Sequence, residues 1–187
     1  MRKIIPFSWT PTSWALRGQS RKIAEAEYNH SDSPYERDIA VAEVTLAGID
    51  LESRLNDINF EYGVISEYDH AKKTIELTCD DDLDKQIKLL KLDIENNVID
   101  SIQGEKEIAN LLKQPWVKVI NDDLDLTDGP NGYYMEFDWN DHWIEKLRSH
   151  GYTGVSDDEV MEKWFVDVCR HQISQANPDY DSGIIIP

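Results

Sequence analysis

One short run of acidic side chains lies at residues 122–128, and carboxylate oxygens are the ligands that calcium prefers. Residues 122–129 read Asp-Asp-Leu-Asp-Leu-Thr-Asp-Gly, which is similar to a calcium-binding loop. The glycine comes one position too late for the EF-hand pattern, and the twelfth position counted from Asp123 is not a glutamate. We therefore expect a solvated acidic turn here rather than a calcium site.

A second possible metal site lies just after this loop. Asp138 and His142 are four residues apart, as are Asp141 and Glu145, and this spacing would place each pair on one side of a helix. No third ligand from another element is evident, and capping of a helix would explain Asp138 without a metal. His171 has no serine or cysteine nucleophile marked beside it by a motif. We expect no metal and no cofactor.

Known catalytic motifs are missing from the sequence. There is no Gly-x-x-x-x-Gly-Lys phosphate loop, no Gly-x-Ser-x-Gly nucleophile elbow and no His-Glu-x-x-His metal motif. An active site would need residues that leave no sequence signature. We therefore expect a protein without enzyme activity.

The elements that would position these side chains begin with a repeat. The pairs Glu27-Tyr28, Glu61-Tyr62 and Glu95-Asn96 are spaced 34 residues apart, and each ends an amphipathic stretch that is followed by a second helix-like run. A fixed period of this size is typical of stacked helical hairpins. We predict three helical hairpins within residues 23–113, with coincidence among Glu-rich helices as the alternative.

The turns of these hairpins carry specific end signals. Gly63 and Asn97 fall at equivalent positions, and both residue types readily adopt the left-handed conformation that ends a helix. Ser66 and Asp100 are then the expected N-caps of the returning helices. The first copy is more divergent, with Pro34 at a suitable first helical position.

The third copy resembles the short helical-hairpin module called SHOCT. The stretch from Ile94 to Leu112 has Val98-Ile99-Asp100, Glu105-Lys106 and Leu111-Leu112 in the expected order, although Asn97 stands where the module prefers glycine. Other segments are similar to uncharacterised proteins of tailed phages, and this resemblance implies a phage context without a mechanism. These segments are Pro6–Trp9, Ser13–Gly18, Ala24–Tyr28, Pro115–Val119, Phe137–Asn140 and Trp164–Arg170.

Charge is distributed unevenly along the 187 residues, which have a net charge of −18. Residues 1–22 contain five basic residues and no acidic one, which leaves 14 basic and 37 acidic residues in the rest of the chain. Such an acidic body should repel nucleic acid, because lysine and arginine contacts to phosphate dominate that affinity. We expect no direct binding of nucleic acid.

The basic N-terminal segment is also rich in proline and aromatic residues. Pro6 and Pro11 disfavour a helix interior, and large aromatic side chains are enriched at protein interfaces. We predict that residues 1–22 form an extended arm that binds another protein or another copy, and the alternative is an arm that folds back on its own domain. The expected partner-binding residues are Phe7, Trp9, Trp14 and Arg17.

The composition changes at Lys113-Gln114-Pro115. Residues 116–120 and 132–137 are rich in β-forming side chains, and the turn signal Asp-Gly-Pro-Asn-Gly at 128–132 lies between them. We predict two antiparallel strands, which need helices to cover them because an isolated hairpin is marginally stable.

Two helices are expected to follow the strands. The first is capped by Asp138 or Asn140 and ends near His150-Gly151, and the second begins at a capping box of Ser156 and Glu159. Residues 115–176 then form a small α+β domain with a ββαα order, whose tryptophans are expected in the core. Residues 177–187 are expected to form an extended apolar tail.

The fold class predicted is mainly α with a small α+β part. No apolar run is long enough for a membrane span or a signal peptide, and Cys79 and Cys169 are not in a Cys-x-x-Cys pair, so we expect free thiols and a cytoplasmic location.

Three functions stay open: a phage structural or assembly protein in the infected host or the virion, an acidic DNA-mimic decoy that binds a host or defence protein, and a metal-dependent hydrolase. The first is favoured, with other phage proteins or copies of itself as partners.

Overall fold

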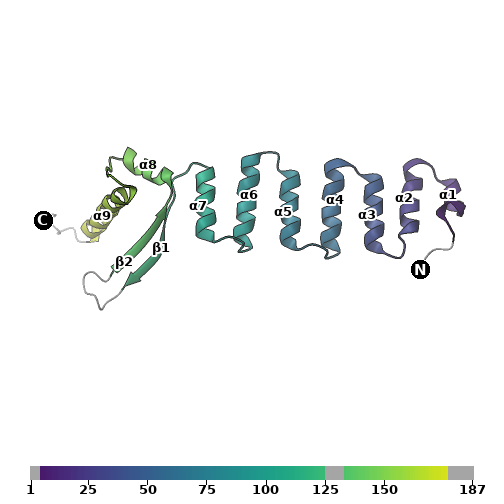
Figure 1. Ribbon diagram of the computed structural model, residues 1–187, viewed down its shortest axis with the longest axis horizontal. Helices are drawn as coiled ribbons and strands as arrows, with labels where there is room; N and C mark the ends of the chain where they lie inside the picture. Colours follow the sequence, from purple (N-terminus) through teal and green to yellow (C-terminus); the bar gives the residue numbers. More distant parts are fainter. Residues whose placement is uncertain (1–4, 125–132, 177–187) are drawn as a thin grey trace. The chain divides into compact units, whose positions relative to one another are not determined.

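The structure is a computed structural model that describes residues 5–124 and 133–176. It is mainly helical with one small antiparallel sheet, which confirms the predicted fold class (Figure 1). Most of the acidic loop, the turn at 128–132 and the tail at 177–187 lie outside the described residues. The elements are η1 (Phe7–Trp9), α1 (Pro11–Ala15), α2 (Gly18–Asn29), α3 (Pro34–Thr45), α4 (Gly48–Glu61), α5 (Glu67–Thr78), α6 (Asp82–Glu95), α7 (Ser101–Leu111), β1 (Val117–Leu124), β2 (Tyr133–Trp139), α8 (Asp141–Ser149) and α9 (Asp157–Ala176).

Two compact units divide the chain between Val98 and Ile99. The sequence had placed this boundary at 113–115, and that prediction is wrong because α7 joins the strands rather than the preceding helices. Lys106 of α7 pairs with Asp138 of β2 at 2.6 Å. We call residues up to Val98 unit 1 and residues from Ile99 unit 2.

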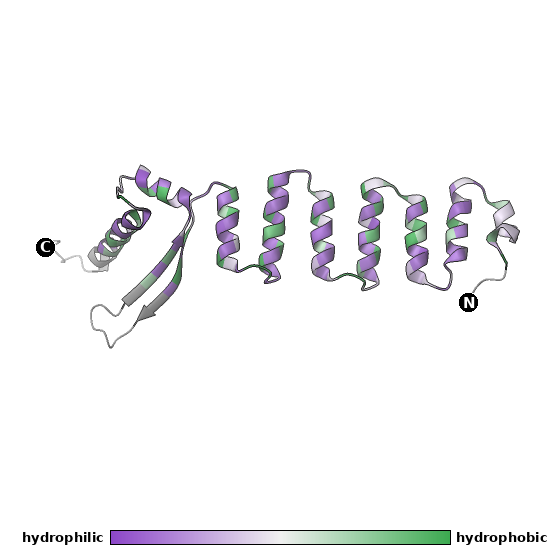
Figure 2. Ribbon diagram, in the orientation of Figure 1, coloured by the Kyte–Doolittle hydropathy of each residue, from purple (hydrophilic) through white to green (hydrophobic). Residues whose placement is uncertain are grey.

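Unit 1 is a row of antiparallel helices in which each helix contacts the next, from α2 to α6 (Figure 1). Every helix in the row carries both hydrophilic and hydrophobic residues, as amphipathic helices in a single layer require (Figure 2). A single layer has little interior, so few side chains are fully buried. The most buried of them is Ile58 of α4, with no exposed surface.

Two turns in this row have the same geometry at positions 34 residues apart. Gly63 after α4 and Asn97 after α6 have φ angles of 68° and 55°. In the first turn the backbone N–H of Val64 donates to the carbonyl of Asn59, and in the second the backbone N–H of Val98 donates to the carbonyl of Asp93, each at 2.8 Å. This pattern closes the C-terminus of a helix and satisfies carbonyls that would otherwise lack donors.

The predicted N-caps of the returning helices are confirmed. The Ser66 hydroxyl accepts from the backbone N–H of Asp69, and the Asp100 carboxylate accepts from Ile102 N–H at 2.8 Å. In the more divergent first hairpin, Ser33 caps α3 and Pro34 occupies its first position.

Tyrosine hydroxyl groups link one hairpin to the next in unit 1. The second residue of α3, Tyr35, donates to Asn59 at 2.8 Å, and the second residue of α5, Tyr68, donates to Asp93 at 2.7 Å. Asn59 and Asp93 lie near the ends of α4 and α6, so the two hydrogen bonds join corresponding places on successive helices. The second residue of α7 is Ile102, which has no hydroxyl group and cannot continue the series.

A third tyrosine, Tyr62, forms a hydrogen bond between helices whose contribution to stability should depend on pH. Tyr62 donates to Asp38 at 2.8 Å, and this bond, with Arg37 beside it, holds the pKa of the Asp38 carboxyl below its ordinary value. The stabilisation is therefore fully present above the ordinary carboxyl pKa and is lost as pH falls through the lowered pKa. Replacing Tyr62 with Phe should raise the pKa of Asp38 and remove this part of the acid dependence of stability.

Carboxyl NMR titration and urea unfolding at several pH values would measure both effects. The Tyr68→Phe variant is the matched control, because it removes a phenol–carboxylate bond elsewhere and should leave the Asp38 pKa unchanged. An unchanged Asp38 pKa in Tyr62→Phe would contradict the assigned hydrogen bond.

Unit 2 is built on the two antiparallel strands that the sequence predicts. β1 pairs with β2 so that Val117 lies opposite Trp139 and Val119 opposite Phe137, with a bulge before Asn121. The apolar face of this hairpin packs on α8 and α9 around a small core, and Trp139, Trp143 and Trp164 pack against that core as predicted. The buried core residues are Ile144, Leu147, Val160 and Met161.

Asn140 joins α7, α8 and the segment between α7 and β1, and it confirms one of the two predicted N-caps of α8. Its side-chain oxygen accepts from the backbone N–H groups of Trp143 and Trp116, at 3.0 and 2.9 Å. Its amide nitrogen donates to Asn110 of α7 and to the carbonyl of Gln114. All four hydrogen-bonding positions of the buried amide are therefore filled.

Within residues 5–124 and 133–176, no helix is long and apolar enough to cross a membrane.

Candidate protein-interaction surface

Residues 5–17, which we call the end segment, fold at the start of unit 1. The prediction of an extended arm is wrong for the described residues, because η1 and α1 form here and residues 18–22 belong to α2. Pro11 is the first residue of α1, where its missing N–H is no loss, and the Thr10 hydroxyl caps the helix. The prolines therefore start a helix instead of preventing one.

Phe7 attaches the end segment to α2. Its side chain is only 5% exposed, and its ring lies 5.7 Å from the ring of Tyr28. The Tyr28 hydroxyl donates to the backbone carbonyl of Ile5 at 2.8 Å. Phe7 was predicted to contact a partner, and this is wrong because the side chain is already buried within the chain.

Trp9 and Trp14 lie in the same segment but face solvent. Each is 72% exposed, although the Trp14 indole N–H donates to the carbonyl of Ser8 at 2.9 Å. Buried Ser13 also donates to the Ser8 carbonyl and to that of Thr10, which fixes the backbone between the two tryptophans. The segment has thus folded back on its own domain without hiding its tryptophans.

Basic residues lie where the end segment meets α2. Arg17 precedes α2, and Arg21 and Lys22 follow in the first turns of that helix; all three are exposed. Positive charge therefore adjoins the exposed tryptophans, and the combination of aromatic and arginine side chains is typical of the centres of protein interfaces. Of the four predicted contact residues, Trp9, Trp14 and Arg17 are available to a partner.

The residues considered for metal binding do not come together. Asp138 lies in β2 rather than on a helix with His142, and it pairs with Lys106, while His142 lies 3.3 Å from Glu145. In the described parts of the chain, no three His, Cys, Asp or Glu side chains are grouped so that they could hold a metal ion.

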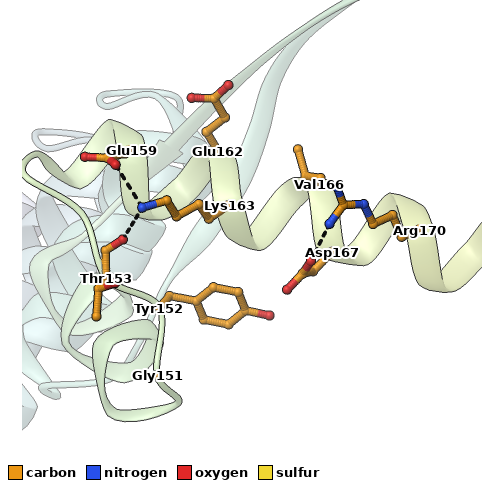
Figure 3. A pocket seen from close by; sticks show the side chains of 9 residues that line it. All are labelled: Gly151, Tyr152, Thr153, Glu159, Glu162, Lys163, Val166, Asp167 and Arg170. Atoms are coloured by element: carbon orange, nitrogen blue, oxygen red, sulfur yellow. Dashed lines mark hydrogen bonds and ion pairs between the residues drawn. The ribbon is translucent and has the colours of Figure 1, made fainter. Parts of the chain in front are cut away.

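An open groove of about 560 Å³ lies in unit 2 between α9 and the loop that precedes it (Figure 3). Lys163 crosses the groove and donates to the carbonyl of Thr153 at 2.6 Å and to Glu159 at 2.8 Å. The bond from Lys163 lowers the pKa of the Glu159 carboxyl. Arg170 pairs with Asp167 farther along α9. Both basic side chains of the groove therefore already have partners within the unit, and these contacts pair no nucleophile with a base.

Sequence reasoning missed the distinction among the three aromatic residues of the end segment. Phe7 differs from the two tryptophans in one contact, because the ring of Tyr28 covers it. Among the described residues, no aromatic ring contacts Trp9 or Trp14 in this way. Position along the chain could not reveal this, because Phe7, Trp9 and Trp14 share one short segment.

No protein-family model, curated protein or solved structure significantly matches this chain.

Proposed function

We propose that this chain is a non-enzymatic structural or assembly protein that acts through protein–protein contacts. The end segment is the binding surface, with Trp9 and Trp14 as its anchors and Arg17 beside them. The observation that carries this proposal is the 72% exposure of both tryptophans on a segment that is itself held in place by Phe7 and Tyr28.

The position of the tryptophans supports binding for a physical reason. An outer face of a helical array that stays in water is normally polar. The end segment instead presents two large aromatic side chains to water. Buried tryptophan and arginine side chains carry much of the energy of protein interfaces, so a partner that covers these groups would gain affinity.

The biological setting follows from the resemblance to tailed-phage proteins. In that setting the chain would act in the cytoplasm of the infected host or in the virion, and its partners would be other phage proteins or copies of itself. A DNA-mimic decoy is the second candidate, and the net charge of −18 favours it. A decoy would bind through its acidic surfaces and would not need the tryptophans.

The double variant Trp9→Ala/Trp14→Ala tests the proposal. Loss of two interface anchors at about 2 kcal/mol or more each should weaken association with the native assembly by more than about 100-fold. Association would be measured by affinity capture of the tagged chain from cells that produce it, followed by a binding titration with the recovered partner.

The matched control is Val64→Ala, which truncates another exposed apolar side chain in the same unit. The substitutions leave Phe7 and Tyr28 in place, so the end segment stays attached, whereas deletion of residues 1–22 would also remove the first turn of α2. Capture that is unchanged in the double variant but lost at high salt would favour the decoy and contradict the proposed surface.

A further inference from the structure

We propose that the end segment binds the acidic helical surface of a second copy of this chain. This inference rests on the proposed function and names its partner. The contact is head-to-tail, because the basic aromatic segment of one copy meets a different surface on the next copy.

Charge complementarity within unit 1 is the first support. The first 22 residues carry five basic and no acidic groups, whereas residues 23–98 carry 19 acidic and 7 basic ones. Acidic residues therefore outnumber basic ones in residues 23–98, and four of the seven basic residues already form ion pairs within the unit. The pairs are Arg37–Asp38, Arg54–Glu61, Lys73–Glu52 and Lys88–Asp84.

Exposed apolar side chains among these carboxylates are the second support. Ile49 is 63% exposed and is followed directly by Asp50, and Leu83 is exposed between Asp82 and Asp84. A tryptophan that docks on such a surface finds an apolar contact, and a neighbouring arginine finds a carboxylate. Unit 1 thus contains both chemical halves of an interface.

The two halves occupy different positions on the unit, which determines the symmetry of the contact. When two copies associate through these unlike surfaces, one copy still has a free end segment and the other a free acidic surface, so further copies can add. Such contacts produce rings when the rotation closes and filaments when it does not. Both outcomes suit a protein of a larger assembly.

Sedimentation velocity of the full chain over a range of concentrations tests this inference. The wild-type chain should form dimers and larger species at about 0.05 M salt and should lose them at about 0.5 M salt, where exposed charges are screened. Trp9→Ala/Trp14→Ala should be monomeric alone. Mixed with a labelled wild-type chain it should still form a complex, because its acidic surface is intact.

The mixing step separates the possible results. A complex that forms only on mixing supports the head-to-tail contact, whereas failure of the double variant to bind wild-type chain would overturn it. A wild-type chain that stays monomeric at every concentration also overturns it. If the wild-type chain stays monomeric but captures a different protein through its tryptophans, the proposed function still holds. If the chain neither associates with itself nor captures a partner through its tryptophans, both the inference and the proposed function are wrong.

Discussion

Replacing Asn140 with Ala should lower the free energy of unfolding of unit 2 by about 3–4 kcal/mol. The Asn140 side chain is buried and makes four hydrogen bonds that join α7, the segment between α7 and β1, and α8. Its loss would remove the cap of α8 and leave the backbone N–H of Trp116 without this acceptor.

Tryptophan fluorescence during urea unfolding would measure this change. Four tryptophans lie in unit 2, and the two in unit 1 are already mostly exposed, so the signal reports mainly on unit 2. Asn140→Asp is the matched variant, because it retains both acceptor bonds but turns a carboxylate oxygen towards the Gln114 carbonyl in place of the donor, and it should also be less stable than wild type. Equal stability of all three proteins would show that Asn140 does not join these elements.

Replacing Ile58 with Ala should destabilise unit 1 by about 3–4 kcal/mol. Ile58 is fully buried in α4 and is the most buried side chain of a single layer of helices. A large-to-small change there loses apolar burial and leaves a cavity, and the few other buried side chains cannot compensate. The loss should be a large fraction of the stability of the unit.

Urea unfolding followed by far-ultraviolet circular dichroism, with hydrogen exchange of the α4 amides, would measure this effect. Ile49→Ala is the control, since the same substitution in the same helix removes a side chain that is 63% exposed and should change stability by less than about 0.5 kcal/mol. If the two variants lost equal stability, α4 would not pack as described.

Local signals in the sequence predicted much of the fold. The glycine and asparagine at 63 and 97 and the caps at 66 and 100 were predictable, because the end of a helix depends on nearby backbone geometry and side-chain acceptors. The cap of α8 was predictable for the same reason, and the two strands were predictable from their β-forming side chains and the turn signal between them.

Contacts between distant residues were not predictable in this way. The boundary between units lies before α7 because of pairs such as Lys106–Asp138, which are 32 residues apart. The division of the end segment into a buried Phe7 and exposed tryptophans depends on Tyr28 in the next helix. A single sequence contains these residues but does not indicate which of them meet.

Hydroxyl-radical footprinting of Trp9 and Trp14 tests the binding surface most directly. Oxidation of both side chains would be compared between the free monomeric chain and the chain in its native assembly, with Trp164, which packs against the core of unit 2, as the internal reference. We predict strong oxidation of Trp9 and Trp14 in the free chain and protection of both in the assembly. Equal oxidation of both tryptophans in the two states would contradict the assignment of the end segment as the binding surface.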